Sequence, residues 1–167
     1  MLEATEFKIL PIGAVPGGHL VAFELHQSAY VALRVTMPDR DGEAAAGTLQ
    51  LLPIDPPVGP ARLMTFDDMH ETPCIDLGPA AIRVPERALF TVPSGDRSSG
   101  YDLLIGTEGA AITAYFGPRG FDRCTWSVLT GMPVIAQHQV RRFPQWEIGV
   151  TQGTDFRSVA SFPLRVE

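Results

Sequence analysis

The apolar positions of the chain recur with a period of two over many short stretches. This is the spacing at which side chains alternate between the two faces of a β-strand. Sixteen glycines and 15 prolines are spread through the 167 residues, and most stretches between them are too short for a helix of ordinary length. The pattern therefore predicts an all-β protein with about ten to twelve short strands.

Two hairpins are the clearest elements of this pattern. Residues 20–25 and 30–36 are joined through His26-Gln27-Ser28, and residues 101–105 and 110–116 flank a loop that begins with Gly106 and ends with Gly109. Further strands are expected at residues 7–10, 48–54, 80–84, 88–92, 122–129, 133–140, 145–151 and 156–162. Antiparallel strands without crossover helices pack as a sandwich or close into a barrel, and we expect an antiparallel β-sandwich, with a closed β-barrel as the alternative.

Two segments depart from the strand pattern. Thr65–Glu71 is expected to form one or two helical turns, because Thr65 stands where an N-cap would stand and Asp67 and Asp68 fall in the first turn. Residues 52–60 contain four prolines, which cannot donate hydrogen bonds to a sheet. They are expected to form an exposed connection and not a central strand.

Size, cysteines and the amino terminus indicate the class of protein. A chain of 167 residues with 45% apolar residues can bury a core without disulfides, and we expect a single domain over residues 1–167. Cys74 and Cys124 are too far apart for a CxxC motif and are expected to be reduced thiols. Glu3 and Glu6 stand where a signal peptide would be positive, and no apolar run approaches membrane-spanning length, so a cytoplasmic protein without a membrane partner is expected.

The charge of the chain is negative and uneven. The formal net charge of −6 argues against nucleic acid as a partner, because phosphate binding relies on clustered Lys and Arg. Residues 39–76 contain eight acids against two arginines, a net charge of −6, whereas residues 119–165 contain six arginines against three acids, a net charge of +3. Either the two halves neutralise one another on folding, or the acidic half forms a face that attracts a basic partner.

The first functional hypothesis follows from the acidic half. It is a non-enzymatic interaction module, of the kind represented by inhibitors and immunity proteins, that binds the basic surface of a partner protein. The candidate contacts are the acidic residues Asp39, Asp41, Glu43, Asp67, Asp68 and Glu71. The sequence does not indicate an oligomeric state.

No sequence motif predicts a cofactor, a metal or a catalytic residue. Asp67, Asp68, His70 and Glu71 are close in sequence but match no metal-binding spacing. GxSxG, Walker and GxGxxG motifs are absent. The cluster is therefore interpreted as a capped turn whose acids lie at the positive end of the helix dipole.

The alternative hypothesis is a small-molecule-binding barrel or a small barrel enzyme. His138 shares strand parity with Val134 and Val140, so it would line a cavity if that face points inward. Trp126 or Trp146 would then stack on the ligand. Trp146 also alternates in step with apolar residues, as a core residue does.

Overall fold

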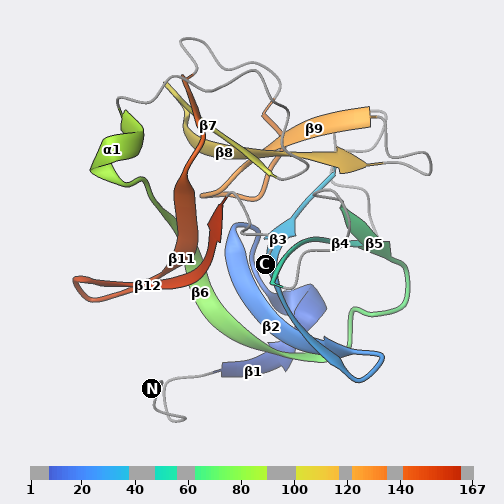
Figure 1. Cartoon of the computed structure of the whole chain (residues 1–167). Helices are drawn as coiled ribbons and strands as arrows, with labels where there is room; N and C mark the ends of the chain where they lie inside the picture. Colours follow the sequence, from blue (N-terminus) through green and yellow to red (C-terminus); the bar gives the residue numbers. More distant parts are fainter. Residues whose placement is uncertain are drawn as a thin grey trace.

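The computed structural model describes residues 8–37, 48–55, 63–89, 101–116, 122–134 and 141–162. Within this part the chain forms twelve strands, all paired antiparallel, in two sheets (Figure 1). The helical elements of the described part are a 3-10 turn, η2 (Ile12–Ala14), and one helical turn, α1 (Glu86–Leu89). The all-β prediction and the expected number of strands are confirmed.

The larger sheet has eight strands. They are β1 (Lys8–Pro11), β2 (His19–Leu25), β3 (Ser28–Val35), β4 (Leu49–Asp55), β5 (Met64–Phe66), β6 (Pro73–Arg83), β11 (Trp146–Gln152) and β12 (Asp155–Phe162). Seven of them follow one another in the order β12-β11-β6-β2-β3-β4-β5, and β1 pairs with β6. The sheet curls so far that β12 contacts β4, although these two strands are not paired.

The smaller sheet has four strands and lies above the larger one in Figure 1. Its strands are β7 (Asp102–Gly106), β8 (Gly109–Phe116), β9 (Asp122–Ser127) and β10 (Arg141–Phe143), in the order β10-β7-β8-β9. Neither sheet closes on itself among the described strands. The predicted sandwich is confirmed in preference to the closed barrel.

Both predicted hairpins are present. β2 and β3 are joined by His26 and Gln27, which have positive φ angles of 50° and 65°. A two-residue turn with positive φ at both positions matches the right-handed twist of the flanking strands. β7 and β8 are joined at a turn that ends with Gly109, whose φ is +95°.

Three local predictions are wrong. Met64–Phe66 is strand β5, paired with Leu49–Leu51, and the expected helical turns over Thr65–Glu71 are replaced by this strand and a bend. Ala88 and Leu89 belong to α1 and not to a strand. The rest of that expected strand, residues 90–92, and most of the expected strand 133–140 lie outside the described residues.

The third error concerns Pro53, which is a buried residue of β4. Ala32 is opposite Pro53 and Val31 is opposite Asp55, so Ile54 is an extra residue in β4 and forms a bulge. Proline is tolerated beside a bulge because the ladder hydrogen bonds are already interrupted there. The pairing with β5 also ends at Leu51, before the proline.

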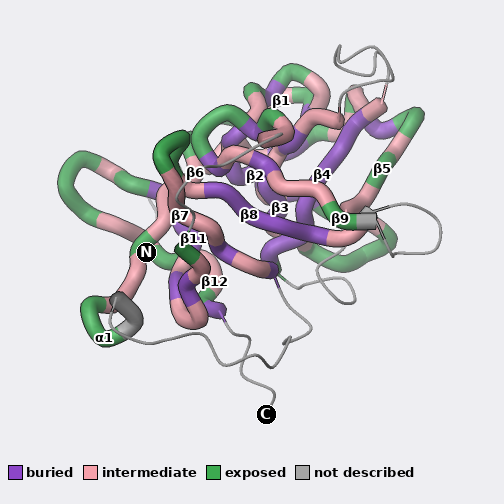
Figure 2. The backbone as a smooth tube through the Cα atoms, turned by 90° about the horizontal axis from the view of Figure 1, so that it is seen from above, coloured by how far each residue is buried: buried purple, intermediate pink, exposed green. Residues whose placement is uncertain are grey.

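The central strands of the larger sheet bury side chains on both faces. Toward the smaller sheet, Leu20, Leu33 and Leu52 join one apolar cluster with Leu103, Ile112 and other residues of that sheet. On the opposite face, Val21, Ala32 and Leu51 pack in a second cluster with Ile12 and Met69. Figure 2 shows the buried positions gathered in β2, β3, β4 and β8, with exposed positions at the turns.

The described part of the chain contains no helix that is long and apolar enough to cross a membrane.

One buried hydrogen bond joins the two layers. The hydroxyl of Tyr101, at the start of β7, donates to the backbone carbonyl of Pro53 at 2.6 Å. Burial raises the pKa of Tyr101, so the phenol remains a neutral donor at physiological pH. The ring of Tyr101 meets the ring of Phe162 edge to face, with centroids 5.6 Å apart.

We therefore expect Tyr101→Phe to lower the free energy of unfolding by about 1–2 kcal/mol, because the buried carbonyl of Pro53 loses its donor. Urea unfolding followed by fluorescence measures this change. Tyr30→Phe is the matched control, since Tyr30 is only half-buried and its hydroxyl makes no hydrogen bond with the described residues. Equal effects of the two substitutions would contradict the assignment.

Candidate functional site

The acidic candidates that the structure describes lie on one short connection. Asp67, Asp68 and Glu71 are exposed, and they stand between the end of β5 and the start of β6. We call residues 67–72 the acidic connection. Asp39, Asp41 and Glu43 lie outside the described residues.

The acidic connection is held against the larger sheet by its other residues. Met69 is buried in the second apolar cluster. The backbone N–H groups of Ile12 and Gly13 donate to the carbonyls of Thr72 and His70, each at 2.9 Å. The side chain of His70 lies so close to Gly13 that a Cβ there would be 2.7 Å from its Nδ1. The connection is therefore a fixed platform from which the three carboxylates project into solvent.

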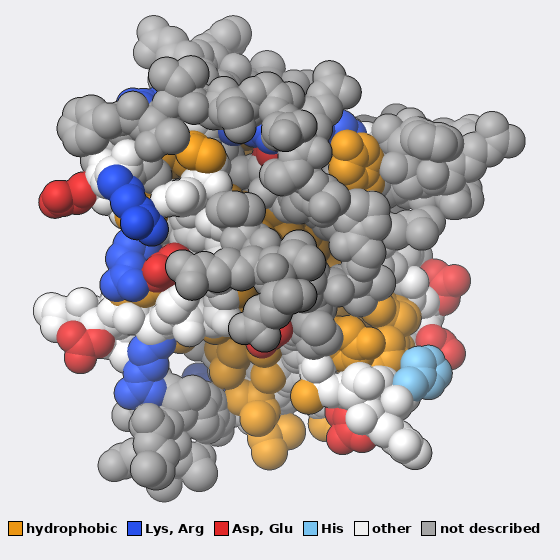
Figure 3. Space-filling model, in the orientation of Figure 1, with side chains coloured by type: hydrophobic (Ala, Val, Ile, Leu, Met, Phe, Trp, Pro, Cys, Tyr) orange, Lys and Arg blue, Asp and Glu red, His pale blue; other side chains and the backbone are white. Residues whose placement is uncertain are grey.

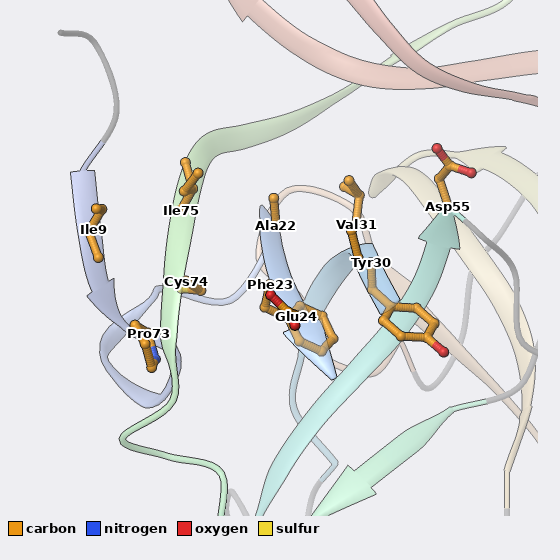
Figure 4. A pocket seen from close by; sticks show the side chains of 11 residues that line it. Ile9, Ala22, Phe23, Glu24, Tyr30, Val31, Asp55, Pro73, Cys74 and Ile75 are labelled. Carbon is orange, nitrogen blue, oxygen red and sulfur yellow. The ribbon is translucent and has the colours of Figure 1, made fainter. Parts of the chain in front are cut away.

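A row of opposed residues crosses five strands of the larger sheet. Ile9 of β1 is opposite Ile75 of β6, Ile75 is opposite Ala22 of β2, Ala22 is opposite Val31 of β3, and Val31 is opposite Asp55 of β4. Residues opposed in this way have side chains on the same face of a sheet. Figure 4 shows Ile75, Ala22, Val31 and Asp55 pointing to one side, with the rings of Phe23 and Tyr30 on the other.

This row lines a pocket of about 450 Å³, which we call the trough. Its floor is apolar. Two carboxylates stand among its lining residues, Glu24 two positions after Ala22 on β2 and Asp55 at the end of β4, and both residues are exposed. No Lys, Arg or His is among the lining residues, so the trough combines an apolar surface with uncompensated negative charge.

The arginines of the carboxyl-terminal half do not neutralise the acidic half in the described part of the chain. Arg123 and Arg142 both bind Asp102, and Arg83 binds Glu147. Among the described acids of residues 39–76, Asp76 alone lies within ion-pair distance of a basic side chain, His19. In Figure 3, the acidic side chains on the right of the molecule have no Lys or Arg beside them, whereas those on the left lie near Lys or Arg side chains. Within the described residues, the acids of residues 39–76 are thus not paired with arginines of the carboxyl-terminal half.

The side chains of His19 and Asp76 meet at a bulge in strand β6. His19 Nδ1 lies 2.9 Å from Asp76 Oδ1, which also accepts the backbone N–H of Gly78 at 2.9 Å. Gly78 has a φ of +101° and is opposite Leu20, whereas Asp76 is opposite Val21, so Leu77 is an extra residue in β6. The carboxylate of Asp76 therefore holds a β-bulge at the point where β6 leaves β1 and approaches β11.

The two tryptophans proposed as ligand contacts have different surroundings. Trp126 is fully buried between the sheets, and its Nε1 donates to the carbonyl of Thr36 at 3.1 Å. Trp146 stacks on Phe162 with ring centroids 4.2 Å apart, and both rings line a second pocket of about 510 Å³ beside α1. His138 lies outside the described residues.

Both cysteines have pKa values above the ordinary value for a thiol. Burial, together with the charge of Asp76, raises the pKa of Cys74 to about 11. Burial also raises the pKa of Cys124, against a smaller opposite effect of the backbone at Thr125. Both thiols are therefore protonated at physiological pH. In the described segments, no three His, Cys, Asp or Glu side chains lie close enough together to hold a metal ion.

The sequence analysis does not predict the trough, although part of the pattern that forms it can be found in the sequence. The alternation along β2 places Ala22 and Glu24 on one face, and the two-residue turn fixes Ala22 opposite Val31. The neighbours of this hairpin, β6 and β4, come from distant parts of the chain. Their register depends on two bulges that no residue pattern in the sequence indicates.

Comparison with known proteins found no matching family model, no matching curated protein and no matching solved structure.

We expect Met69→Ala to lower the free energy of unfolding by about 2–3 kcal/mol, because it leaves a cavity under the acidic connection. Asp68→Asn should change it by less than about 0.5 kcal/mol, since that carboxylate is exposed and has no ion pair with a described residue. Denaturant unfolding of the two variants measures both values. A large effect of Asp68→Asn would mean that the carboxylate stabilises the fold and is not available to a partner.

Proposed function

We propose that the protein is a non-enzymatic interaction module that binds a basic segment of a partner protein, as an inhibitor or an immunity-type protein does. The observation that carries this proposal is the absence of arginine partners, within the described residues, for Asp55, Asp67, Asp68 and Glu71. Unpaired carboxylates on one part of a surface create a negative potential that accelerates encounter with a basic protein.

The trough supplies the contact that charge alone lacks. A Lys or Arg side chain has an apolar stem and a charged end, and it covers apolar surface with the stem while its end stays in polar surroundings. On this chain the stem would lie on Ala22, Val31 and Ile75, and the charged end would reach Glu24 or Asp55. This combination selects a partner segment in which basic and apolar residues lie side by side.

The acidic connection has a different role in the same proposal. Its carboxylates are exposed and screened by solvent, so each contributes little to affinity at equilibrium. Their contribution is to the rate of association at low salt, because long-range attraction orients the partner before contact.

A blocked hexapeptide of alternating lysine and valine tests the trough. We expect the methyl signals of Ala22 and Val31 to shift saturably in NMR titrations with this peptide, but not with the matching glutamate–valine peptide. Glu24→Gln combined with Asp55→Asn should weaken binding about tenfold, because each lysine loses a charge-assisted hydrogen bond.

Glu108→Gln is the matched control for that titration. Glu108 is an equally exposed acid, but it lies on the turn between β7 and β8, on the other sheet. It should leave the affinity for the lysine–valine peptide unchanged. Equal weakening by this control, or equal binding of the glutamate peptide, would refute recognition at the trough.

A second candidate function has one supporting observation, the pocket lined by Trp146 and Phe162. Its other lining residues include Gln145, Glu147 and Ser161, so polar groups surround the buried pair of rings. A small aromatic ligand bound there would quench the fluorescence of Trp146, and Trp146→Phe would remove that response. Quenching that survives the substitution would place the ligand elsewhere.

A further inference from the structure

The outward face of the smaller sheet carries a polar row that the proposed function does not use. Asp102 of β7 is opposite Thr113 of β8, and Thr113 is opposite Thr125 of β9. The hydroxyl oxygens of the two threonines are 2.8 Å apart. The alternate residues of these strands, such as Leu103 and Ile112, belong to the core between the sheets, so this row lies on the opposite face of the smaller sheet, where Thr113 is itself buried.

Two arginines converge on Asp102 from opposite sides. Arg142 of β10 donates from Nη2 to Oδ1, and Arg123 of β9 donates from Nη2 to Oδ2 at 2.6 Å. Since β9 and β7 are separated by β8, the side chains of Arg123 and Asp102 together bridge about 10 Å across the sheet. On the way, its guanidinium lies 5.3 Å from the centre of the Tyr115 ring. Both guanidinium groups are thus held in place before any ligand arrives.

The charges in this cluster do not balance. One carboxylate faces two guanidinium groups, so the cluster formed by Asp102, Arg123 and Arg142 carries a net charge of +1. Each guanidinium has five N–H donors, and the structure shows only Nη2 hydrogen-bonded for each arginine among the described residues. The side chains of Arg123 and Arg142 are 42% and 33% exposed, so their remaining donors are accessible from solvent.

We infer that Arg123 and Arg142 form a binding site for the carboxylate group of a ligand. A second carboxylate would bring the net charge of the cluster to zero. Its two oxygens match the forked donors that each guanidinium still presents. Because Asp102 and Tyr115 already fix the two side chains, binding costs less conformational entropy than it would with free surface arginines.

The chain contains an internal comparison, the pair of Arg83 and Glu147. Here one guanidinium faces one carboxylate, and both Nε and Nη2 of Arg83 donate to the same oxygen, at 3.1 and 2.6 Å. This pair is neutral and its Nε is occupied. It should therefore not respond to a carboxylate that binds Arg123 and Arg142.

The arginine Nε–H signals of the 15N-labelled protein test the site. Titration with sodium acetate, at an ionic strength kept constant with sodium chloride, should shift the signals of Arg123 and Arg142 saturably and leave that of Arg83 unchanged. Arg142→Lys keeps the charge but removes the fork, so it should weaken the response of Arg123 about fivefold. Arg83→Lys is the matched control and should leave that response unchanged.

Three outcomes would overturn the inference. They are a shift that chloride reproduces, a shift of Arg83 equal to those of the pair, and tighter binding of methyl phosphate than of acetate.

A blocked Gly-Asp-Gly peptide then identifies the source of the carboxylate. Binding of acetate and peptide alike supports an acidic side chain of a protein, and binding of acetate alone supports a small organic acid. Because the wild-type comparison of three arginines needs no variant, the test stands even if Arg142→Lys destabilises the fold.

Discussion

The need to cover both faces of the larger sheet determines the arrangement of the rest of the molecule. Strands β2, β3 and β4 bury alternate residues on each side, and an uncovered apolar face costs about 25 cal/mol for each Å² left in water. The smaller sheet covers one face. The 3-10 turn η2 and the acidic connection cover part of the other through Ile12 and Met69. Met69 is buried in the connection, whereas its carboxylates stay exposed.

The need to cover both faces of the larger sheet also explains where the trough lies. The row from Ile9 to Asp55 is on the face that the smaller sheet covers elsewhere, but it lines an open pocket. Ile9 is 73% exposed, far more than the apolar residues of the core. The proposed partner site is therefore an apolar surface beside Glu24 and Asp55. The rest of the fold covers this surface only in part, so it stays accessible.

Several elements could be predicted because they depend only on neighbouring residues. The two hairpins follow from alternation and from turn positions that His26, Gln27 and Gly109 occupy with positive φ. The segment Thr65–Glu71 shows the limit of such reasoning. Its acids and threonine fit a capped helix, yet Met64–Phe66 find backbone partners in β4, and pairing with a distant strand outweighs local preference. The prediction that excluded Pro53 from a central strand fails for the same reason, since the bulge that accommodates this residue depends on the register of β3 against β4.

The two-residue turn at His26 and Gln27 has a consequence for how this chain tolerates insertions. Their exposed side chains belong to neither apolar cluster, but the length of the turn sets Ala22 opposite Val31 and so aligns the middle of the trough. Surface turns usually accept insertions and deletions readily, because no packing is lost. Here a shift of register by one residue would turn Val31 to the opposite face and bring Ala32 into the trough. The length of this turn is therefore constrained by the trough, although the side chains of the turn take no part in it.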